Sequence, residues 1–417
     1  MLTRPTRPLT RAVAVLGALT LALIGALVAV VLTPSPTQAA PVRTHVLTGY
    51  WQNFDNGATP LRLRDVPDEY GIVAVAFADA VPGRAGAIDF NLDPDLAAKL
   101  GGYTEADLKA DVAALQAEDR QVIISVGGEK GTVYLNDAAA GQAFAESTLA
   151  LMDEFGFDGV DIDLENAPNL QHMSEALRQI SAASPGYVLT MAPETIYVQP
   201  GGSYLALIDE VRELITVVNT QYYNSGAMVG RDGRVYSSGT VDFQTALADI
   251  LLDGHLRPDQ VGLGLPASPR GAGSGYVDPA VVTQALDCLA AGTRCGSYRP
   301  AAQYPTIRGA MTWSINWDAA NGYDFATTVG GHLVDFPNGG GPTEPTEPTE
   351  PTEPTDPTDP TDPTDPTGCA GVSAWSAGTT YVGGNRASHG GRVWLARWWT
   401  LGETPGSAEV WSDQGAC

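Results

Sequence analysis

The chain has 417 residues, of which 44% are hydrophobic, and its 48 acidic and 23 basic side chains give a formal net charge of -25. This length exceeds that of one small domain and the apolar content suffices for a sizeable core, so two or more modules are expected. The negative charge argues against nucleic acid as a partner, because phosphate binding requires a basic surface. Neutral or cationic ligands fit better.

The N-terminus has the pattern of a secretory signal. Three arginines within the first eleven residues precede an uncharged apolar run over 12–32, and small residues follow, with a cleavage site near Ala39 or Ala40. We therefore expect a signal peptide over 1–40 and a secreted, extracellular protein that has no membrane contact after cleavage. The apolar run is also long enough to span a bilayer, which leaves an uncleaved anchor as the alternative.

Eight short runs rich in β-branched and apolar residues follow, separated by stretches of helical character. The predicted strands are 46–51, 72–77, 121–126, 157–163, 187–193, 215–222, 260–266 and 308–314. The predicted helices include 104–119, 137–155, 169–184, 240–253 and 279–291. This alternation predicts an α/β fold, a (β/α)8 TIM barrel over 41–338, with an open doubly wound sheet as the alternative. In a barrel the active site lies at the carboxyl ends of the strands.

The fourth predicted strand carries a row of carboxylates. Residues 157–165 read Phe-Asp-Gly-Val-Asp-Ile-Asp-Leu-Glu, so Asp161, Asp163 and Glu165 alternate with apolar residues and point to one face. Three like charges at this spacing repel one another, which a purely structural strand does not favour. The row therefore predicts a site that keeps a carboxyl group protonated near neutral pH. Asp158 has the opposite parity and is expected to hydrogen-bond locally.

Acid–base catalysis explains this row better than metal binding does. An EF-hand calcium loop also opens with alternating acids, but Asn166 stands where that loop needs glycine and His172 where it needs glutamate. The five histidines show no metal-ligand spacing, so neither a metal nor another cofactor is expected. Glu165, last in the row and nearest the barrel mouth, is the expected proton donor. Asp161 and Asp163 would disfavour a further negative charge and so help Glu165 to keep its proton.

Beyond the predicted barrel the composition changes twice. Residues 339–368 are expected to form a linker, and 343–366 within it are eight consecutive tripeptides, four Thr-Glu-Pro and then four Thr-Asp-Pro, in which proline at every third position prevents helix and sheet. The last segment, 369–417, holds five of the eight tryptophans. A β-rich module this small cannot bury them all, and exposed aromatic rings suit stacking on sugar rings. The four cysteines group by position into two candidate disulfides, Cys288 with Cys295 and Cys369 with Cys417. The sequence proves neither bridge.

Five motifs at successive predicted strand ends resemble those of glycoside hydrolase family 18, the chitinases and their relatives. They are Ser125-Val-Gly127-Gly128, the row from Asp158 to Glu165, Met191-Ala-Pro193-Glu194, Gln221-Tyr-Tyr223-Asn224 and Met311-Thr-Trp313-Ser314. The resemblance covers about 46–336. Two glycines in the first motif are expected to serve backbone packing, and the same is expected of Ser125.

The resemblance implies a retaining mechanism in which the substrate's own acetamido oxygen attacks the anomeric carbon. Glu165 would donate the proton, Asp163 would orient the acetamido nitrogen, Asp161 would support Asp163, and Tyr223 would hold the acetamido carbonyl oxygen. The implied substrate-binding residues are Trp313, Met191, Gln221, Asn224 and Tyr50. About 40 residues separate Pro266 from Ile307. This leaves no room for the α+β insertion of some family members, and an open groove favours attack within chains.

The tail pattern resembles carbohydrate-binding modules of families 5 and 12. It reads Ala374-Trp375, Tyr381-Val-Gly383-Gly384 and Ala396-Arg397-Trp398-Trp399-Thr400. The resemblance implies chitin contacts through Trp398, Trp399 and Tyr381, while Trp375 and Trp411 are expected in the core. We therefore expect a secreted, endo-acting chitinase that is monomeric and acts on chitin and chitooligosaccharides. The alternatives are an endo-β-N-acetylglucosaminidase acting on glycans and a non-catalytic chitin-binding lectin.

Overall fold

The computed structural model describes Met1, residues 42–336 and most of the C-terminal segment. In that segment the described residues are 372–377, 379–381, 385–396, 400–401, 403–408 and 410–416. The expected signal peptide beyond Met1, the linker and the Cys369–Cys417 pair therefore lie outside the described residues. Within the described ranges, no helix is both long and apolar enough to cross a membrane.

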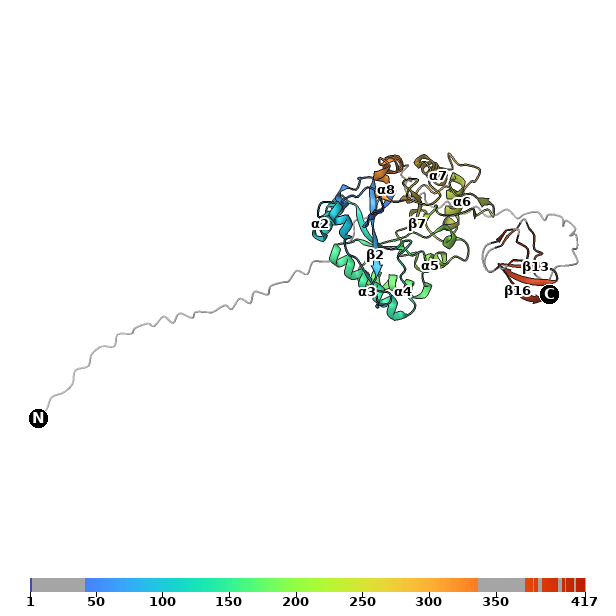
Figure 1. The fold of residues 1–417 in the computed structure, drawn as a ribbon, viewed down its shortest axis with the longest axis horizontal. Coiled ribbons are helices and arrows are strands. Elements are labelled where there is room, and N and C mark those ends of the chain that lie inside the picture. The colour runs from blue at the N-terminus through green and yellow to red at the C-terminus, as the bar shows by residue number, and fades with distance from the viewer. Residues whose placement is uncertain are drawn as a thin grey trace. The chain divides into compact units, whose positions relative to one another are not determined.

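Eight parallel strands close into a barrel within residues 42–336 (Figure 1), which confirms the predicted fold. Each strand pairs in parallel with its neighbours, and the last pairs with the first. The strands are β1 (Val46–Gln52), β2 (Tyr70–Ala80), β4 (Gln121–Gly127), β5 (Gly159–Asp163), β6 (Val188–Met191), β7 (Val217–Gln221), β10 (Val261–Pro266) and β11 (Gly309–Trp313). All eight predicted strands are present. The largest difference is at β2, which is longer than predicted.

Helices surround the strands (Figure 1). The α-helices are α1 (Pro94–Lys99), α2 (Glu105–Gln116), α3 (Ala138–Phe155), α4 (Leu170–Ala183), α5 (Ser203–Val211), α6 (Val241–Leu252), α7 (Pro279–Ala291), α8 (Ile315–Ala320) and α9 (Gly331–Val334). Short helical turns are η1 (Leu63–Asp65), η2 (Thr195–Val198), η3 (Pro258–Gln260) and η4 (Ala326–Gly330). Two short pieces of sheet were not predicted: β3 (Ile88–Asp89), beside β2, and a hairpin of β8 (Met228–Val229) and β9 (Val235–Tyr236).

The five helices that the sequence predicts all form, and the first shows why. The Thr104 hydroxyl accepts a hydrogen bond from the Asp107 backbone N–H at 3.1 Å, and Asp107 in return accepts one from the Thr104 N–H at 3.0 Å. This reciprocal capping satisfies backbone donors at the start of α2 that have no partner within the helix. The missed helices are mostly short, so they offer too few turns for a clear periodic signal.

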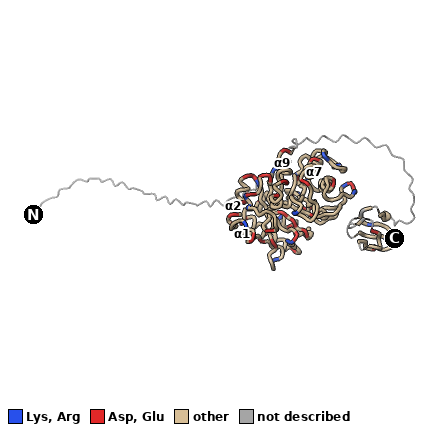
Figure 2. The backbone as a smooth tube through the Cα atoms, turned by 45° about the horizontal axis from the view of Figure 1, so that its top comes forward, with Lys and Arg blue, Asp and Glu red and all other residues tan. Residues whose placement is uncertain are grey.

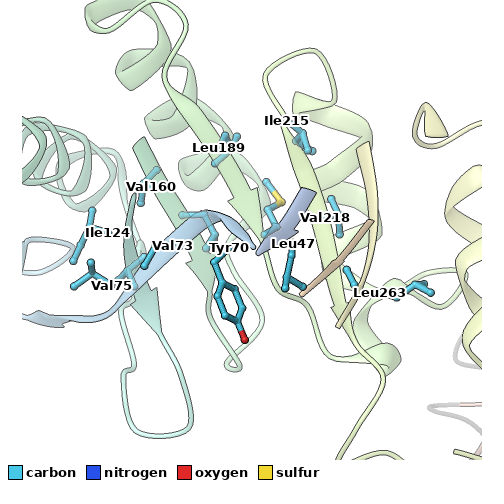
Figure 3. Close-up of a cluster of buried hydrophobic side chains, with 14 of the residues drawn as sticks. Leu47, Tyr70, Val73, Val75, Ile124, Val160, Leu189, Ile215, Val218 and Leu263 are labelled. Carbon is cyan, nitrogen blue, oxygen red and sulfur yellow. The ribbon is translucent and has the colours of Figure 1, made fainter. Parts of the chain in front are cut away.

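Side-chain alternation along the strands separates two layers of core. Outward-facing residues pack beneath the helices, and Figure 3 shows such residues from several strands, among them Val73, Ile124, Val160, Leu189, Val218 and Leu263. A smaller cluster that includes Val46, Ile72 and Ile123 fills the barrel interior. On β5 the inward positions are the acids Asp161 and Asp163, only 1% and 4% exposed. The barrel interior is therefore where the fold buries the predicted carboxylate row.

The connection from β10 to β11 contains α7 and irregular loops but no α+β domain, in agreement with the sequence. A disulfide joins Cys288, in α7, to Cys295 in the loop after it. One of the two candidate bridges is thus present. Figure 2 shows acidic positions scattered over many helices and loops of the barrel, with basic positions among them. The net charge therefore does not by itself mark a single surface.

The C-terminal module is a small antiparallel β structure. Its strands are β12 (Thr380–Tyr381), β13 (Arg386–His389), β14 (Arg392–Ala396), β15 (Thr400–Leu401) and β16 (Trp411–Ala416). β13, β14 and β16 form one sheet, and β12 pairs with β15. The core contains Trp411 and Tyr381, 5% and 7% exposed, and the partly buried Trp375 packs against it.

Candidate active site

Asp161 lies inside the barrel at the centre of a hydrogen-bond network from three other strands. Its carboxylate accepts hydrogen bonds from the hydroxyls of Tyr50 (2.7 Å), Ser125 (2.7 Å) and Thr190 (2.5 Å), on β1, β4 and β6. Burial raises the pKa of Asp161, and the three hydroxyl donors oppose that rise by stabilising the charged form. Asp161 is therefore the member of the row that is best equipped to carry a negative charge.

Asp163 lies two residues further along β5, closer to the barrel mouth, and accepts fewer hydrogen bonds than Asp161 does. Gln221, at the end of β7, donates an amide hydrogen bond to it at 2.8 Å. Burial raises the pKa of Asp163 well above its usual range, and the charges of Asp161 and Glu165 raise it further. The environment thus favours a protonated Asp163 beside a charged Asp161, so the pair can share one proton.

Glu165 follows β5 and is half-buried, with its carboxyl group nearer to solvent than those of Asp161 and Asp163. Burial is the main cause of its raised pKa, and the charges of Glu194 and Glu129 add to the rise, whereas a hydrogen bond from Gln221 opposes it. The sequence correctly expects a raised pKa here. It attributes the rise to Asp161 and Asp163, whereas the structure assigns it to burial and to acids on two neighbouring loops.

An aromatic wall and a tyrosine lie near the acids. Trp313, at the end of β11, stacks on Phe77 of β2 with ring centroids 5.6 Å apart, and Phe77 stacks on Phe54 at 6.4 Å. Tyr223 is 7% exposed, and burial together with the charges of Asp163 and Glu165 raises its pKa well above its usual range. It therefore stays protonated. Among the described residues no hydrogen-bond partner of its hydroxyl is recorded, so this donor is available to a ligand.

Three predicted substrate-binding residues have other contacts. Tyr50 is 1% exposed and donates to Asp161, which makes it a support for that carboxylate rather than a surface for a sugar. Met191 is fully buried at the end of β6. Asn224 is exposed, and its side-chain oxygen accepts backbone hydrogen bonds from Gly273 at 2.9 Å and Ser274 at 3.2 Å, so it fixes the loop after β10. Gln221 joins Asp163 to the barrel, as described above.

The motif around β4 has both a packing and an electrostatic role. A Cβ atom on Gly127 would lie 2.0 Å from the Asp163 carbonyl oxygen, and one on Gly128 would lie 2.7 Å from the Phe77 ring. Both glycines therefore allow close packing, as expected. Ser125 does more than the predicted packing, because its hydroxyl donates to Asp161. Asp158 accepts a hydrogen bond from the Val122 N–H at 2.7 Å, in agreement with its predicted local role.

Tyr381, predicted to contact chitin, lies in the core of the module, where its hydroxyl accepts a hydrogen bond from the Ser376 N–H at 2.8 Å. Its ring packs edge-on against Trp411, with centroids 4.9 Å apart. This packing leaves little of the ring for a sugar and corrects the expected surface role. Trp398 and Trp399 lie outside the described residues.

Sequence reasoning missed several residues around the acids. Thr190 is separated from Asp161 by 29 residues, and Phe54 and Phe77 come from loops and strand ends that carry no recognised motif. Glu194 is part of a quoted motif, but its proximity to Glu165 is visible only in the fold. Within the described ranges no group of side chains is arranged to hold a metal ion.

Comparison with known proteins identifies this site. The model of glycosyl hydrolases family 18 matches residues 46–340, and that of carbohydrate-binding module family 5/12 matches residues 374–412. A solved structure described as a putative chitinase A from Streptomyces coelicolor is 56% identical, covers 70% of this chain and 99% of its own, and superposes with a TM-score of 0.68. A family 18 chitinase from Chromobacterium violaceum is 36% identical over 71% of this chain and 85% of its own, with a TM-score of 0.65.

Curated relatives with a similar sequence support the same family. Chitinase Chi52 of Paenibacillus xylanexedens is 38% identical over 327 residues, 69% of this chain and 61% of the relative. Exochitinase 1 of Streptomyces olivaceoviridis is 36% identical over 341 residues, 71% of this chain and 57% of the relative. The chain thus spans about three fifths of the length of these relatives. It belongs to glycosyl hydrolases family 18, and its C-terminal segment is a carbohydrate-binding module of family 5/12.

Proposed function

We propose that the protein is a secreted, endo-acting chitinase that hydrolyses β-1,4 bonds between N-acetylglucosamine units with retention of configuration. The observation that carries this proposal is that the three acids of the row have different environments. Asp161 is held by three hydroxyls, Asp163 is pushed toward its protonated form, and Glu165 faces the mouth with a raised pKa. A site that must supply a proton to a leaving oxygen at near-neutral pH needs such an acid.

In the proposed reaction Glu165 transfers its proton to the glycosidic oxygen as the bond to the anomeric carbon breaks. The acetamido oxygen of the same sugar attacks that carbon and forms an oxazolinium ion, so no protein nucleophile is required. An Asp163 carboxyl oxygen accepts a hydrogen bond from the acetamido N–H, and the proton that Asp163 shares with Asp161 keeps Asp163 uncharged beside Glu165 as Glu165 becomes a carboxylate. Tyr223 donates to the acetamido carbonyl oxygen, and Trp313 provides an apolar floor for the sugar ring. Water activated by the resulting Glu165 carboxylate then opens the intermediate.

The substrate class follows from the same residues together with the tail module. Named chitinases among the relatives support chitin, and a module of family 5/12 would tether the barrel to an insoluble polymer. Short connections from β10 to β11, without an added domain, support an open groove and attack within chains. The relatives include both an exochitinase and endochitinases by name, so the mode of attack is a proposal from this chain's own loops.

The decisive experiment compares the wild type with Glu165→Gln on a chitin hexamer. We expect the variant to lose about 10²- to 10⁴-fold in kcat, the range typical of a missing general acid. Glu154→Gln is the control, because Glu154 lies on the surface, where it pairs with Lys109. Equal, measurable rates for Glu165→Gln and the wild type would overturn catalysis by Glu165. No hydrolysis by either protein would favour the non-catalytic chitin-binding lectin.

The products of the wild type test the remaining parts of the proposal. Retention predicts that the newly formed reducing ends are initially β anomers, and endo attack predicts trimers and tetramers early in the reaction. Dimers alone, released from chain ends, would contradict endo attack. Cleavage of glycoprotein glycans without cleavage of the hexamer would identify an endo-β-N-acetylglucosaminidase. Secretion predicts that protein from the culture medium begins near residue 40 or 41, which N-terminal sequencing measures.

A further inference from the structure

A fourth carboxylate, Glu194, lies at the barrel mouth and has no role in the mechanism described above. It lies in the loop that follows β6, the strand next to β5. Its backbone forms a parallel β-bridge with Gln221, and the Gln221 N–H donates to the Pro193 carbonyl oxygen at 2.9 Å. Glu194 therefore occupies a fixed backbone position beside the amide that bonds Asp163 and Glu165.

A second connection fixes Glu194 relative to Glu165. The Tyr197 N–H, within η2, donates to the Glu194 carbonyl oxygen at 3.0 Å, and the Tyr197 hydroxyl donates to the Glu165 carbonyl oxygen at 3.3 Å. One tyrosine thus bridges the backbone segments that carry the two carboxyl groups. Together with Gln221, it makes the spacing of Glu194 and Glu165 a property of the barrel rather than of two free loops.

The charge of Glu194 is not neutralised locally. The Glu194 side chain is half-buried, and this burial raises its own pKa, so its negative charge acts on the alkaline side of the pH profile. Among the described residues its carboxylate has no ion pair and no hydrogen bond. The other titratable groups near Glu165 and the acid row are Asp161 and Asp163 on β5, Glu129 after β4, Tyr197 in η2, Tyr204 in α5 and Tyr223 after β7. None is a cationic residue, and no described Lys, Arg or His forms an ion pair with the acid row or with Glu194. The field at the mouth is therefore uniformly unfavourable to a further negative charge.

We infer that Glu194 is a positioning residue whose fixed, uncompensated carboxylate keeps the proton on Glu165 as the pH rises. This inference rests on the proposed hydrolytic function, because it concerns the protonation of the proposed acid. After burial, the charge of Glu194 is the largest contribution to the raised pKa of Glu165, and it also raises the pKa values of Asp163, Tyr197 and Tyr223. Glu194 thus extends to higher pH the range in which Glu165 is protonated.

The test is the neutral variant Glu194→Gln in the full chain, assayed on soluble chitin oligomers across the pH range. The fall of kcat/KM at alkaline pH should move to lower pH, so that the variant loses about three-fold or more beyond the wild-type midpoint and stays within about two-fold on the acidic side. Glu194→Asp keeps the charge and should restore most of the wild-type profile. Glu129→Gln should shift the profile less, because Glu129 contributes least to the raised pKa.

A second readout separates this inference from the proposed function. Titration of the Glu165 carboxyl carbon by NMR in the substrate-free chain should show a lower pKa in Glu194→Gln than in the wild type, whether or not either protein hydrolyses chitin. An unchanged titration and an unchanged pH profile would overturn the inference. So would a raised KM at every pH with an unshifted alkaline limb, which would make Glu194 a sugar contact. If Glu194→Gln misfolds by circular dichroism, Glu194→Ala replaces it as the neutral variant.

Discussion

A substitution at Tyr50 tests whether the hydrogen bonds to Asp161 inside the barrel, and not only the carboxyl groups themselves, determine the rate of hydrolysis. Tyr50→Phe removes one of three hydroxyls that donate to Asp161 and leaves the ring in place. A hydrogen bond to a charged group contributes about 1.5–3 kcal/mol. If that stabilisation of the Asp161 charge is used when positive charge develops on the substrate, its loss lowers kcat by about 10- to 100-fold.

The reason for this effect lies in the shared proton. Without the tyrosine hydroxyl the Asp161 carboxylate is less stabilised, so Asp161 takes the shared proton more often and leaves Asp163 charged beside Glu165. That charge opposes the negative charge that Glu165 acquires when it gives up its proton. We therefore expect kcat to fall while KM for a chitin hexamer changes little. Tyr187→Phe is the matched control, because its hydroxyl makes only a 3.3 Å hydrogen bond to the Leu177 carbonyl oxygen, away from the acids.

The assay is steady-state hydrolysis of the hexamer, with the melting temperature measured in parallel. A kcat within two-fold of the wild type, in a fully folded variant, would refute the reasoning. A raised KM with unchanged kcat would instead support the substrate contact that the sequence suggested for Tyr50. The two roles therefore give opposite kinetic signatures.

Three further predictions concern stability and the tail module. The folded state raises the pKa of Asp163, so the stability that this carboxyl group contributes is present below its unfolded-state pKa and is lost as the pH rises through its folded-state pKa. The Asp163→Asn variant should therefore melt at least about 2 °C above the wild type at pH 8, with a smaller difference at pH 4, while its activity falls. An equal difference at both pH values would contradict this. Replacing Cys288 and Cys295 by serine removes the seven-residue crosslink and should cost about 2–3 kcal/mol, a melting temperature lower by about 5 °C, with normal oligomer hydrolysis at 25 °C. Changing Trp398 and Trp399 to Ala should abolish pull-down on crystalline chitin and leave hydrolysis of soluble oligomers intact; loss of both would refute separate roles for the two modules.

The sequence predicted the fold because its signals are local. Each barrel strand is a short apolar run, and each of the predicted helices has a long run or a cap such as Thr104. The parity of the acid row follows from the two-residue repeat of a strand, so the sequence correctly places Asp161 and Asp163 on one face. That this face is the barrel interior is a result of the fold. The same parity excluded Asp158 from the row.

What only the tertiary structure decided is which side chains share a charge environment. Tyr50, Ser125 and Thr190 meet at Asp161 because β1, β4 and β6 close around one barrel interior, although they lie 111, 36 and 29 residues from it in the chain. No local pattern encodes such a meeting. The row by itself determined that three acids would be crowded on one face of a strand. The fold decided that hydroxyls stabilise the Asp161 charge, that burial raises the pKa of Asp163, and that Glu194 rather than Asp161 adds to the raised pKa of Glu165. The reason is that solvation and charge act through space and not along the chain.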